Sequence, residues 1–327
     1  MSKIKLEEKN KKEEENETEE KYKIKIIFAF GLILFFIIIG LQLTLTYDET
    51  ISGNLESEQN NNIESSIKDE EENLELETQN YNKTDIIPGK NIIFEGEEYA
   101  IQAEEVEKMI SGTYEGNEKY VFLTFDDGPS PLTNEVLDIL KEEGVKGTFF
   151  MLGNMIESGQ EAKDTLKRAI KEGNAIANHS YSHDFKKLYP GNITDIEYFM
   201  DEFNKTNNIM KEVLGDEFNT RVLRMPGGYN SRVYYNDKNL KELNSVLKEK
   251  GIVSVDWNSL NGDAEGKNYT KEEMIDYVKK TSDGKNQIVL LMHDTYGKEK
   301  TVSMLKDVIK FYKENGYEFK TITDSDF

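Results

Sequence analysis

The residues with the clearest chemical potential in this chain are three histidines and a pair of adjacent aspartates. His179 and His183 have i, i+4 spacing, and on a helical turn this spacing places both imidazoles on one face, where they can bind one metal ion. Asp126 and Asp127 are adjacent, so one carboxylate can complete a three-ligand site with open positions while the other accepts a proton. His293 is the remaining histidine. Such a set is suited to metal-assisted hydrolysis.

The composition limits what this site can bind. The chain has 327 residues and no cysteine, so a metal must take its ligands from His, Asp and Glu. The formal net charge of −22 argues against a nucleic-acid partner, because phosphate binding requires a basic surface. An Asp-Asp-Gly-Pro sequence alone is often only a turn, and a His-x3-His pair alone is often a surface coincidence. Together, with a single further histidine in the chain, they favour a functional cluster.

The elements that must position these residues alternate between short apolar runs and longer helical stretches. Seven strands are predicted, at Tyr120–Phe125, Gly147–Leu152, Ala175–Asn178, Arg221–Arg224, Ile252–Asp256, Gln287–Met292 and Glu318–Ile322. Six long helices are predicted, at Leu132–Glu143, Glu161–Glu172, Asp195–Leu214, Asn239–Lys250, Lys271–Thr281 and Thr301–Asn315. This alternation predicts an α/β fold with a parallel sheet, either a distorted (β/α) barrel of about seven parallel strands or an open doubly wound sheet.

Glycines and capping residues mark the ends of the predicted helices. The glycines that follow a helix and precede a strand, where a left-handed residue is expected, are Gly144, Gly173, Gly251 and Gly316. Ser130-Pro131 predicts an N-cap and the first helical residue. Capping boxes are predicted for Thr194 with Glu197 and for Thr270 with Glu273.

The candidate residues fall at the carboxyl ends of the predicted strands. These residues are Asp126, Asp127, His179, Arg224, Asp256 and His293. In parallel α/β folds the carboxyl ends of the strands meet on one face, where active sites are built. A lone arginine at such a position would be better explained by a structural ion pair, but Arg224 ends a strand beside the other candidates. The pattern therefore predicts one site on this face.

The N-terminal part of the chain has a different texture. Residues 1–25 form a charged tail, and residues 26–45 form an apolar run long enough to cross a bilayer as a helix. Lysines precede this run and acidic residues follow it, so the positive-inside rule places the tail in the cytoplasm and the rest of the chain outside. The run is long for a signal peptide and no A-x-A-like site follows it, which favours an uncleaved single-pass anchor over cleavage.

Two segments separate this anchor from the main domain. Residues 46–91 are rich in Glu, Asn, Ser and Thr and are predicted to form a disordered acidic linker. Residues 92–119 are predicted to be a short lead-in segment, with a strand at Ile92–Phe94 and a helix at Gln102–Ile110. The main domain is predicted to span residues 120–327.

Five short motifs follow one another along this domain. They are Thr124-Phe125-Asp126-Asp127-Gly128-Pro129, His179-Ser180-Tyr181-Ser182-His183, Arg224-Met225-Pro226-Gly227-Gly228, Asp256-Trp257-Asn258 and Leu291-Met292-His293. In this order they resemble the NodB-type polysaccharide deacetylases, carbohydrate esterase family 4. The resemblance covers residues 120–327. It implies a distorted (β/α) barrel that binds a divalent metal, usually Zn²⁺, with Co²⁺ or Ni²⁺ sometimes effective.

The resemblance also implies roles for the matching residues. The metal ligands would be Asp127, His179 and His183. Asp126 would be the general base, Arg224 would hold it, and His293 would be the general acid. Leu291 would form part of the pocket for the acetyl methyl group.

Three further positions carry open alternatives. Gly227 stands where many members have an aromatic residue whose backbone N–H helps to bind the oxyanion, and a glycine can still donate that N–H. Asp256 and Asp263 are both candidates to support His293. The fourth motif of the family often ends in Asp-Trp, and an alignment on Asp263 places Ala264 where the Trp is expected. Trp257 either contacts the substrate or belongs to the core.

The motifs and the anchor together imply an N-deacetylase of peptidoglycan, acting on N-acetylglucosamine or N-acetylmuramic acid and releasing acetate. The expected partners are the cell-wall polysaccharide and the membrane, without nucleic acid, and the expected state is a monomer. The same chemistry is compatible with an exopolysaccharide, chitin oligomers or acetylated xylan. A catalytically inactive wall-binding module is the alternative of another class, and the complete catalytic set argues against it.

Overall fold

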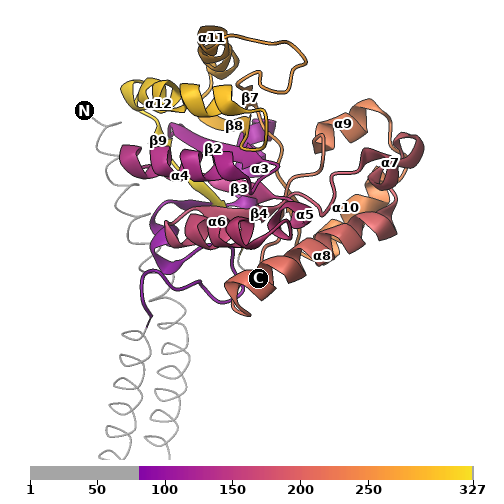
Figure 1. Ribbon diagram of the computed structural model, residues 1–327. Coiled ribbons are helices and arrows are strands. Elements are labelled where there is room, and N and C mark those ends of the chain that lie inside the picture. Colours follow the sequence, from indigo (N-terminus) through magenta and orange to yellow (C-terminus); the bar gives the residue numbers. More distant parts are fainter. Residues whose placement is uncertain (1–80, 326–327) are drawn as a thin grey trace, which may run out of the picture. The chain divides into compact units, whose positions relative to one another are not determined.

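The structure is a computed structural model that describes residues 81–325, in which the chain from Lys83 onwards forms one compact unit (Figure 1). The predicted tail at 1–25, the anchor at 26–45 and residues 46–80 of the predicted linker lie outside the described residues. The end of the predicted disordered linker at 91 is wrong, because Ile87 and Asn91 are buried in the compact unit and Asn91 donates to the Ile322 backbone oxygen. Within residues 81–325 no helix has the length and apolar character needed to span a bilayer.

A parallel eight-stranded sheet forms the centre of this unit. Its strands follow the order β6 (Val253–Ser254), β5 (Val222–Leu223), β4 (Ala175–Asn178), β3 (Thr148–Met151), β2 (Tyr120–Asp126), β8 (Gln287–His293) and β7 (Ser259–Leu260), and β9 (Glu318–Phe319) pairs with β2. Every pairing in this sheet is parallel. The predicted parallel α/β arrangement is therefore confirmed.

The connection between β6 and β7 shows that this sheet curls strongly. These two strands lie at opposite ends of the strand order, yet only residues 255–258 join them. Five residue steps span at most about 18 Å, whereas the edges of a flat seven-stranded sheet would lie about 29 Å apart. The sheet must therefore bend into an incomplete barrel, as a distorted (β/α) barrel requires and an open doubly wound sheet does not.

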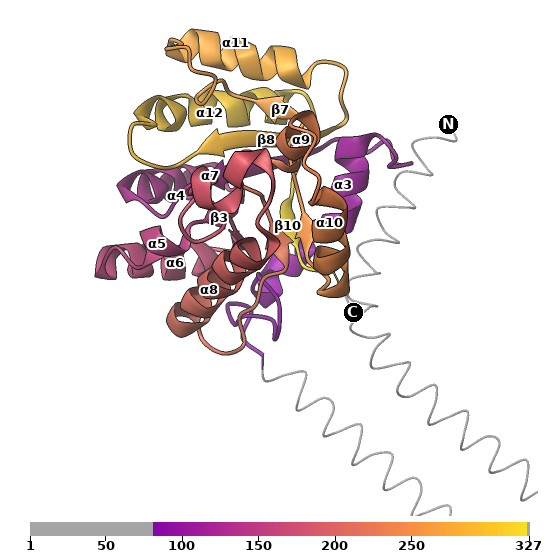
Figure 2. The same cartoon turned by 90° about the vertical axis from the view of Figure 1, so that its right-hand side faces the viewer.

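Alternation along the strands separates an interior from an outer layer. On β2, Tyr120 and Phe122 belong to the interior cluster, whereas Val121, Leu123 and Phe125 pack under the outer helices. The helices that contribute to this outer layer are α4 (Pro131–Glu143), α6 (Gln160–Lys171), α8 (Ile196–Leu214), α11 (Lys271–Ser282) and α12 (Glu299–Glu314), seen around the sheet in Figures 1 and 2. Because side chains alternate with a period of two, the residues that continue the inward series are Thr124 and Asp126.

The segment before β2 is part of the barrel. Strand β1 (Ala100–Gln102) pairs in parallel with β10 (Thr321–Thr323), which joins the two ends of the described chain. Helix α3 (Ala103–Ser111) then contributes Ala103, Val106 and Met109 to the interior cluster, beside residues of β5 and β8. Strands β6 and β7 do not pair with each other, so the barrel is not closed by strands on that side. The apolar side chains of α3 help to fill the interior of this incomplete barrel.

The prediction of a strand at Ile92–Phe94 is wrong. Ile93 makes only an isolated antiparallel bridge with Ile86, and a 3₁₀ helix, η1 (Phe94–Glu98), begins at Phe94. Ile92 and Ile93 are both buried. The apolar run therefore reflects burial of neighbouring side chains against the barrel and not a half-buried strand.

The six predicted long helices are confirmed to within two residues at each end. They are α4, α6, α8, α11 and α12, described above, and α10 (Leu240–Glu249). The left-handed glycines after the helices and the capping box of Thr270 with Glu273 are also confirmed. The capping box predicted at Thr194 is wrong, because Asp195 is the N-cap and Thr194 donates its hydroxyl to Asp237 over 2.6 Å. Short elements that were not predicted are η1, β1, β7, α5 (Gly153–Ile156), α7 (Phe185–Leu188), η2 (Pro190–Asn192) and α9 (Tyr229–Tyr234).

We predict that replacement of Met109 by Ala destabilises the fold, because Met109 is 5% exposed and fills the barrel interior. Deleting such a buried side chain costs about 2–5 kcal/mol. Urea unfolding followed by circular dichroism measures this change. Lys108→Ala on the same helix is the control and is expected to change the unfolding free energy by less than about 0.5 kcal/mol, because its pair with Glu105 is exposed. Equal stability of the two variants would show that α3 is dispensable to the barrel.

Candidate active site

The carboxyl ends of β2, β4, β5 and β8 bring the predicted residues together. Asp126 and His293 end β2 and β8, and the register of these strands places them side by side. His179 follows β4 and Arg224 follows β5, each two residues beyond an interior residue of its strand, Ala177 and Val222. The convergence predicted from strand ends is therefore present in the fold.

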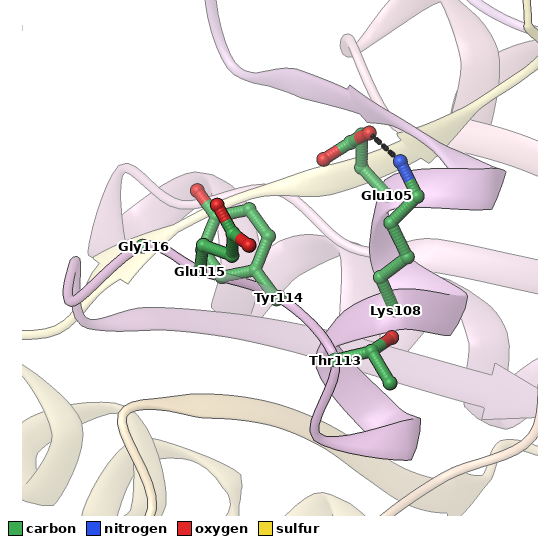
Figure 3. Close-up of a pocket in the computed structure, with 6 residues that line it drawn as sticks. All are labelled: Glu105, Lys108, Thr113, Tyr114, Glu115 and Gly116. Carbon is green, nitrogen blue, oxygen red and sulfur yellow. Dashed lines mark hydrogen bonds and ion pairs between the residues drawn. The ribbon is translucent and has the colours of Figure 1, made fainter.

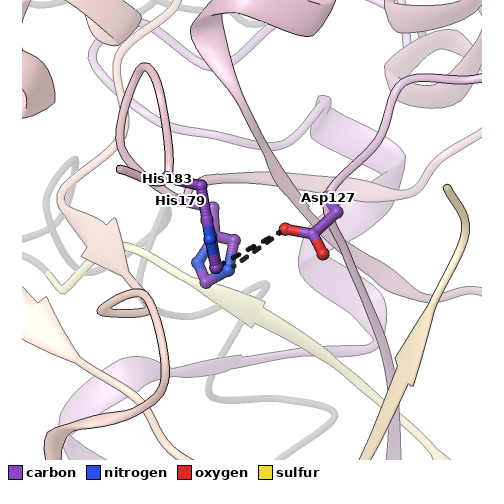
Figure 4. Close-up of side chains that lie close together, drawn as sticks. All are labelled: Asp127, His179 and His183. Atoms are coloured by element: carbon purple, nitrogen blue, oxygen red, sulfur yellow. Dashed lines mark ion pairs between the residues drawn. The ribbon is translucent and has the colours of Figure 1, made fainter. Parts of the chain in front are cut away.

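Three of these side chains form a cluster with the geometry of a metal site. The Oδ1 atom of Asp127 lies 3.6 Å from Nε2 of His179 and 3.7 Å from Nε2 of His183. Figure 4 shows both imidazoles directed at this carboxylate. Two ligands held about 2.0–2.2 Å from a tetrahedral ion are roughly 3.3–3.6 Å apart, so the three atoms need little movement to share one ion.

One oxygen of the Asp127 carboxylate has no hydrogen-bond partner among the described residues. This atom, Oδ1, is buried. A buried carboxylate oxygen without a donor is costly unless a cation satisfies it. Asp127 is itself held in the left-handed region, with φ of 72°, directly after β2. The donor set and this unsatisfied atom fit a divalent ion such as zinc.

The hydrogen bond behind His179 fixes which ring nitrogen faces the cluster. Nδ1 of His179 lies 2.7 Å from the backbone oxygen of Arg224. A carbonyl oxygen only accepts, so Nδ1 carries the proton and donates it, which leaves the lone pair of Nε2 directed at Asp127. Burial lowers the pKa of His183, which favours the neutral form that a metal ligand needs.

The two histidines lie on a loop and not on the predicted helical turn. Ser180 and His183 have φ of 72° and 55°, in the left-handed region, so the chain cannot continue as a right-handed helix there. Glu202, a buried residue of α8, holds this loop: its carboxylate accepts hydrogen bonds from the backbone N–H of Tyr181 and Ser182 and from the Ser182 hydroxyl. A turn with left-handed residues, and not a helix, therefore directs the two imidazoles at Asp127.

Asp126 is oriented by a buried arginine. Nη1 of Arg224 donates to Oδ1 of Asp126 and to the hydroxyl of Thr124, both over 2.8 Å. Arg224 is 0% exposed and Asp126 only 2%, so their charges attract each other in a poorly screened environment. The other oxygen of Asp126, Oδ2, lies 3.7 Å from Nε2 of His179. One oxygen is therefore fixed by Arg224 while the other faces the metal ligands.

His293 is paired with Asp263. Nδ1 of His293 lies 2.8 Å from Oδ1 of Asp263, whose Oδ2 accepts hydrogen bonds from the His293 backbone N–H and the Thr301 hydroxyl. Burial disfavours the imidazolium, but the hydrogen bond and charge of Asp263 outweigh it, so the pKa of His293 is raised. Burial likewise opposes ionisation of Asp263, and its bond with His293 outweighs burial and lowers the pKa of Asp263.

Asp256, the other candidate partner, has a different position. Its two carboxylate oxygens accept hydrogen bonds from the backbone N–H groups of Tyr229 and Asn230 at the start of α9, over 2.7 and 2.9 Å. Its backbone oxygen accepts from Arg224 over 3.0 Å. Of the two candidates it is therefore Asp263 that contacts His293, while Asp256 caps a short helix.

The predicted substrate-contacting residues lie around this group. Gly227 has φ of 76°, and a Cβ added there would lie 2.8 Å from Cε1 of Phe185, so a larger residue would be strained in this backbone conformation. Leu291 is 6% exposed and lies on β8 with the same inward parity as His293. Trp257 is half-buried and packs against the interior cluster, with its ring 5.5 Å from the Arg224 guanidinium. The roles proposed for these residues remain predictions.

Two contributors were not predicted from the sequence. Thr124 stands inside the first motif, but its hydroxyl matters because it accepts from Arg224 and donates to the Leu290 carbonyl across β8. Glu202 lies three residues after Phe199 on the apolar face of α8. An acidic residue on an apolar face is the signal that could have identified it.

A separate surface hollow lies beside α3. It is lined by Glu105, Lys108, Thr113, Tyr114, Glu115 and Gly116, and Figure 3 shows the ion pair of Glu105 with Lys108 at its side. No predicted site residue lines this hollow. It carries none of the chemistry described above.

Comparison with known proteins agrees with this geometry. The sequence profile of the polysaccharide deacetylase family matches residues 113–247. The peptidoglycan-N-acetylmuramic acid deacetylase PdaA of Bacillus subtilis is 33% identical over 215 residues, which cover 64% of this chain and 73% of that protein. A peptidoglycan-N-acetylglucosamine deacetylase of Bacillus cereus is 31% identical over 213 residues, covering 64% of this chain and 88% of that protein. The chain spans 31% of the length of a bifunctional xylanase/deacetylase from Pseudobutyrivibrio xylanivorans, at 30% identity over 215 residues.

A solved structure extends the match to the fold. A carbohydrate esterase family 4 esterase from Streptococcus mutans superposes with a TM-score of 0.67 at 35% identity, covering 74% of this chain and 99% of that one. The chain therefore belongs to the NodB-type polysaccharide deacetylases of carbohydrate esterase family 4, and it is a deacetylase hydrolase.

We predict that Glu202→Gln weakens Zn²⁺ binding, although Glu202 does not contact the metal cluster. The neutral amide keeps the size of the side chain but loses the charge that holds the histidine loop. Loss of such an outer partner typically costs 10- to 100-fold in metal affinity. Competition titration with a zinc-sensitive dye measures the dissociation constant. Glu197→Gln, at an exposed position of the same helix, is expected to bind zinc as the unaltered protein does. Unchanged affinity in both variants would show that the loop keeps its shape without Glu202.

Proposed function

We propose that this chain is a metal-dependent N-deacetylase of peptidoglycan that acts on N-acetylglucosamine, or on N-acetylmuramic acid, and releases acetate. One observation carries the proposal: an unsatisfied carboxylate oxygen of Asp127 faces two imidazoles, beside a carboxylate held by Arg224. His293, on the adjoining strand, adds a proton donor. These groups supply a metal site, a base and an acid on one face.

The proposed chemistry hydrolyses the amide bond of an acetamido group. Asp127, His179 and His183 hold the divalent ion, which, when bound, supplies Lewis acidity toward water and the acetyl carbonyl oxygen. Asp126 accepts a proton from the attacking water through Oδ2, since Oδ1 is occupied by Arg224. The water oxygen forms the new bond to the acetyl carbon, and the carbon–nitrogen bond then breaks.

The leaving amine must be protonated as that bond breaks. His293 gives this proton, because Asp263 accepts from its Nδ1 and raises the pKa of the imidazole, which favours the protonated form. Leu291 contacts the acetyl methyl group, and the Gly227 backbone N–H faces the developing oxyanion. The products are acetate and a free amine on the sugar.

The activities of two relatives support a peptidoglycan substrate. The Bacillus subtilis relative is named for N-acetylmuramic acid and the Bacillus cereus relative for N-acetylglucosamine. Both sugars carry the acetamido group on which the proposed chemistry acts. Removal of acetyl groups leaves amines, which makes the wall more cationic and reduces its recognition by lysozyme-like enzymes.

We further propose that the catalytic unit acts outside the cell from a single-pass membrane anchor. The apolar run at 26–45 supports this proposal, as do the lysines that precede it. The acidic segment at residues 46–82, between the anchor and the catalytic unit, would as a flexible chain reach roughly 30–36 Å, which suits a polymer just outside the membrane.

The first test measures acetate release by the full-length protein from purified peptidoglycan, after metal removal and after reloading with Zn²⁺. Asp126→Asn is the matched variant, because its amide oxygen can still accept a hydrogen bond from the buried Arg224 guanidinium, whereas Ala removes that acceptor. We expect zinc-dependent acetate release that falls by 10²-fold or more in Asp126→Asn, at the low end of what general-base catalysis supplies, while zinc affinity is retained. Metal-independent release, or an active Asp126→Asn variant, would overturn the proposed roles.

The second test follows the pH dependence of kcat/KM. A general acid works in its protonated form, so the rate falls as pH rises through the pKa of His293, which Asp263 raises above its usual value. Asp263→Asn removes that charge, so the pKa of His293 falls and the alkaline limb moves to lower pH. Asp256→Asn is the control, since Asp256 does not contact His293. If both variants keep the alkaline limb of the unaltered protein, His293 is not the acid.

The third test concerns location. We expect the full-length protein to sediment with membranes and to be degraded by protease added to intact protoplasts. A chain that begins at Lys83 is expected to lose membrane association, because it lacks residues 26–45. Full-length protein in the soluble fraction, or protected from external protease, would contradict the proposed topology.

A further inference from the structure

The exposed aromatic side chains gather on the face that carries the candidate active site. In the part of the chain that the structure describes, the large hydrophobic residues that are exposed are Tyr81, Phe185, Val233, Tyr234, Tyr235 and Tyr296. All except Tyr81 lie in the segments that follow β4, β5 or β8. These are the strands whose ends carry His179, Arg224 and His293. Exposed apolar surface that gathers in one region marks a binding surface.

Three consecutive residues at the end of α9 contribute most of this surface, and we name them the tyrosine ridge: Val233, Tyr234 and Tyr235. They are 55%, 82% and 49% exposed. The two tyrosine rings meet edge to face, with their centroids 5.2 Å apart. One edge-to-face pair of rings presents two flat surfaces in different directions.

The ridge is attached rigidly to the catalytic face. The first N–H groups of α9 donate to the carboxylate of Asp256, whose backbone oxygen accepts from Arg224. Beneath the ridge, the buried Arg232 guanidinium lies 3.9 Å from the ring of Tyr189 and 5.2 Å from the ring of Tyr235. The helix that carries the ridge is therefore held at both of its ends.

A series of ring contacts leads from the metal ligands to the ridge. The ring of Phe185 meets the imidazole of His183 edge to face at 5.0 Å and lies 5.9 Å from the ring of Tyr189. Tyr189 in turn lies under Arg232, which contacts Tyr235. Phe185 is 44% exposed, so this series reaches solvent beside the metal cluster and again at the ridge.

The chemistry of the ridge fits sugar rings. A pyranose presents a face of C–H groups that is apolar and slightly positive, which complements the negative face of an aromatic ring. Tyrosine also carries a hydroxyl that can exchange hydrogen bonds with sugar hydroxyls. A polymer whose acetamido group lies at the metal cluster must continue over the surrounding surface, and Phe185 and the ridge lie on one such path.

We propose that the tyrosine ridge binds sugars of the glycan strand beyond the unit being deacetylated, so that this chain prefers long glycan strands to short oligomers. This inference rests on the proposed deacetylase function and names a subsite for it. The bound class is a β-linked polymer of N-acetylated hexosamines. Tyr234 is the principal contact because its ring is the most exposed, whereas Tyr235 is partly occupied by Arg232.

The test compares kcat/KM for the hexamer and the dimer of N-acetylglucosamine, using the zinc-loaded full-length protein. Tyr234→Ala is expected to lower kcat/KM for the hexamer about 3- to 10-fold through a higher KM, the range that one aromatic contact supplies. The proposed contact is with sugars beyond the unit being deacetylated, so the kinetics of the dimer are expected to be unchanged. Tyr81→Ala is the matched control, because Tyr81 is 56% exposed and precedes a segment that packs against Ala175, at the opposite end of β4 from His179.

Three outcomes would overturn the subsite. The first is an unchanged kcat/KM of Tyr234→Ala for the hexamer, and the second is an equal loss of kcat/KM for hexamer and dimer. The third is a Tyr234→Ala variant that loses only its binding to lipid vesicles, which would assign the ridge to the membrane. If the unaltered protein releases acetate from neither sugar, the proposed function fails. Calorimetric titration of the hexamer into metal-free protein then tests the ridge separately: weaker binding by Tyr234→Ala supports it, and equal binding overturns it.

Discussion

The buried guanidinium of Arg224 is the interaction on which the remainder of the site depends. It lies in the barrel interior, stacked 4.0 Å from the ring of Phe150, and donates to the side chains of Thr124 and Asp126 on β2. It also donates to the backbone oxygens of Val255 and Asp256, in the segment that joins β6 to β7. A buried cation needs such complete pairing to offset its lost hydration. The same hydrogen bonds connect the β6–β7 segment, at the unpaired edges of the sheet, to β2 at its centre.

This arrangement couples the closure of the sheet to catalytic geometry. The backbone oxygen of Arg224 fixes the tautomer of His179, while its side chain orients Asp126, so one residue aligns a metal ligand and the base. Helix α3 completes the apolar interior beside the segment that Arg224 holds. The acid, His293, is positioned independently by Asp263. A site held by rigid strand ends needs little reorganisation during the reaction, which is the condition for effective electrostatic catalysis.

Much of this organisation could be predicted from the sequence because its signals are local. Apolar runs, glycines after helices and motifs at strand ends predicted the parallel α/β arrangement and the face that carries the site. Elements of two to six residues, such as β7 and α9, have too few positions for a detectable period. The choice between Asp256 and Asp263 depended on β7: its pairing of Leu260 with Leu291 brings Asp263 beside His293. The conformation of the histidine loop depended on Glu202, twenty residues away in the chain.

The central role of the Arg224 guanidinium is tested by the effect of Arg224→Lys on stability and on acetate release in the same preparation. Lysine keeps the charge but loses the planar fork that reaches β2 and the β6–β7 connection together. We expect the unfolding free energy to fall by about 1–3 kcal/mol for each buried acceptor that lysine leaves without its donor. We also expect kcat to fall about 10²-fold, because Asp126 is misplaced. Zinc affinity is expected to change little, since the backbone oxygen of residue 224 still holds His179. A variant with normal stability and normal kcat would contradict the central role of this guanidinium.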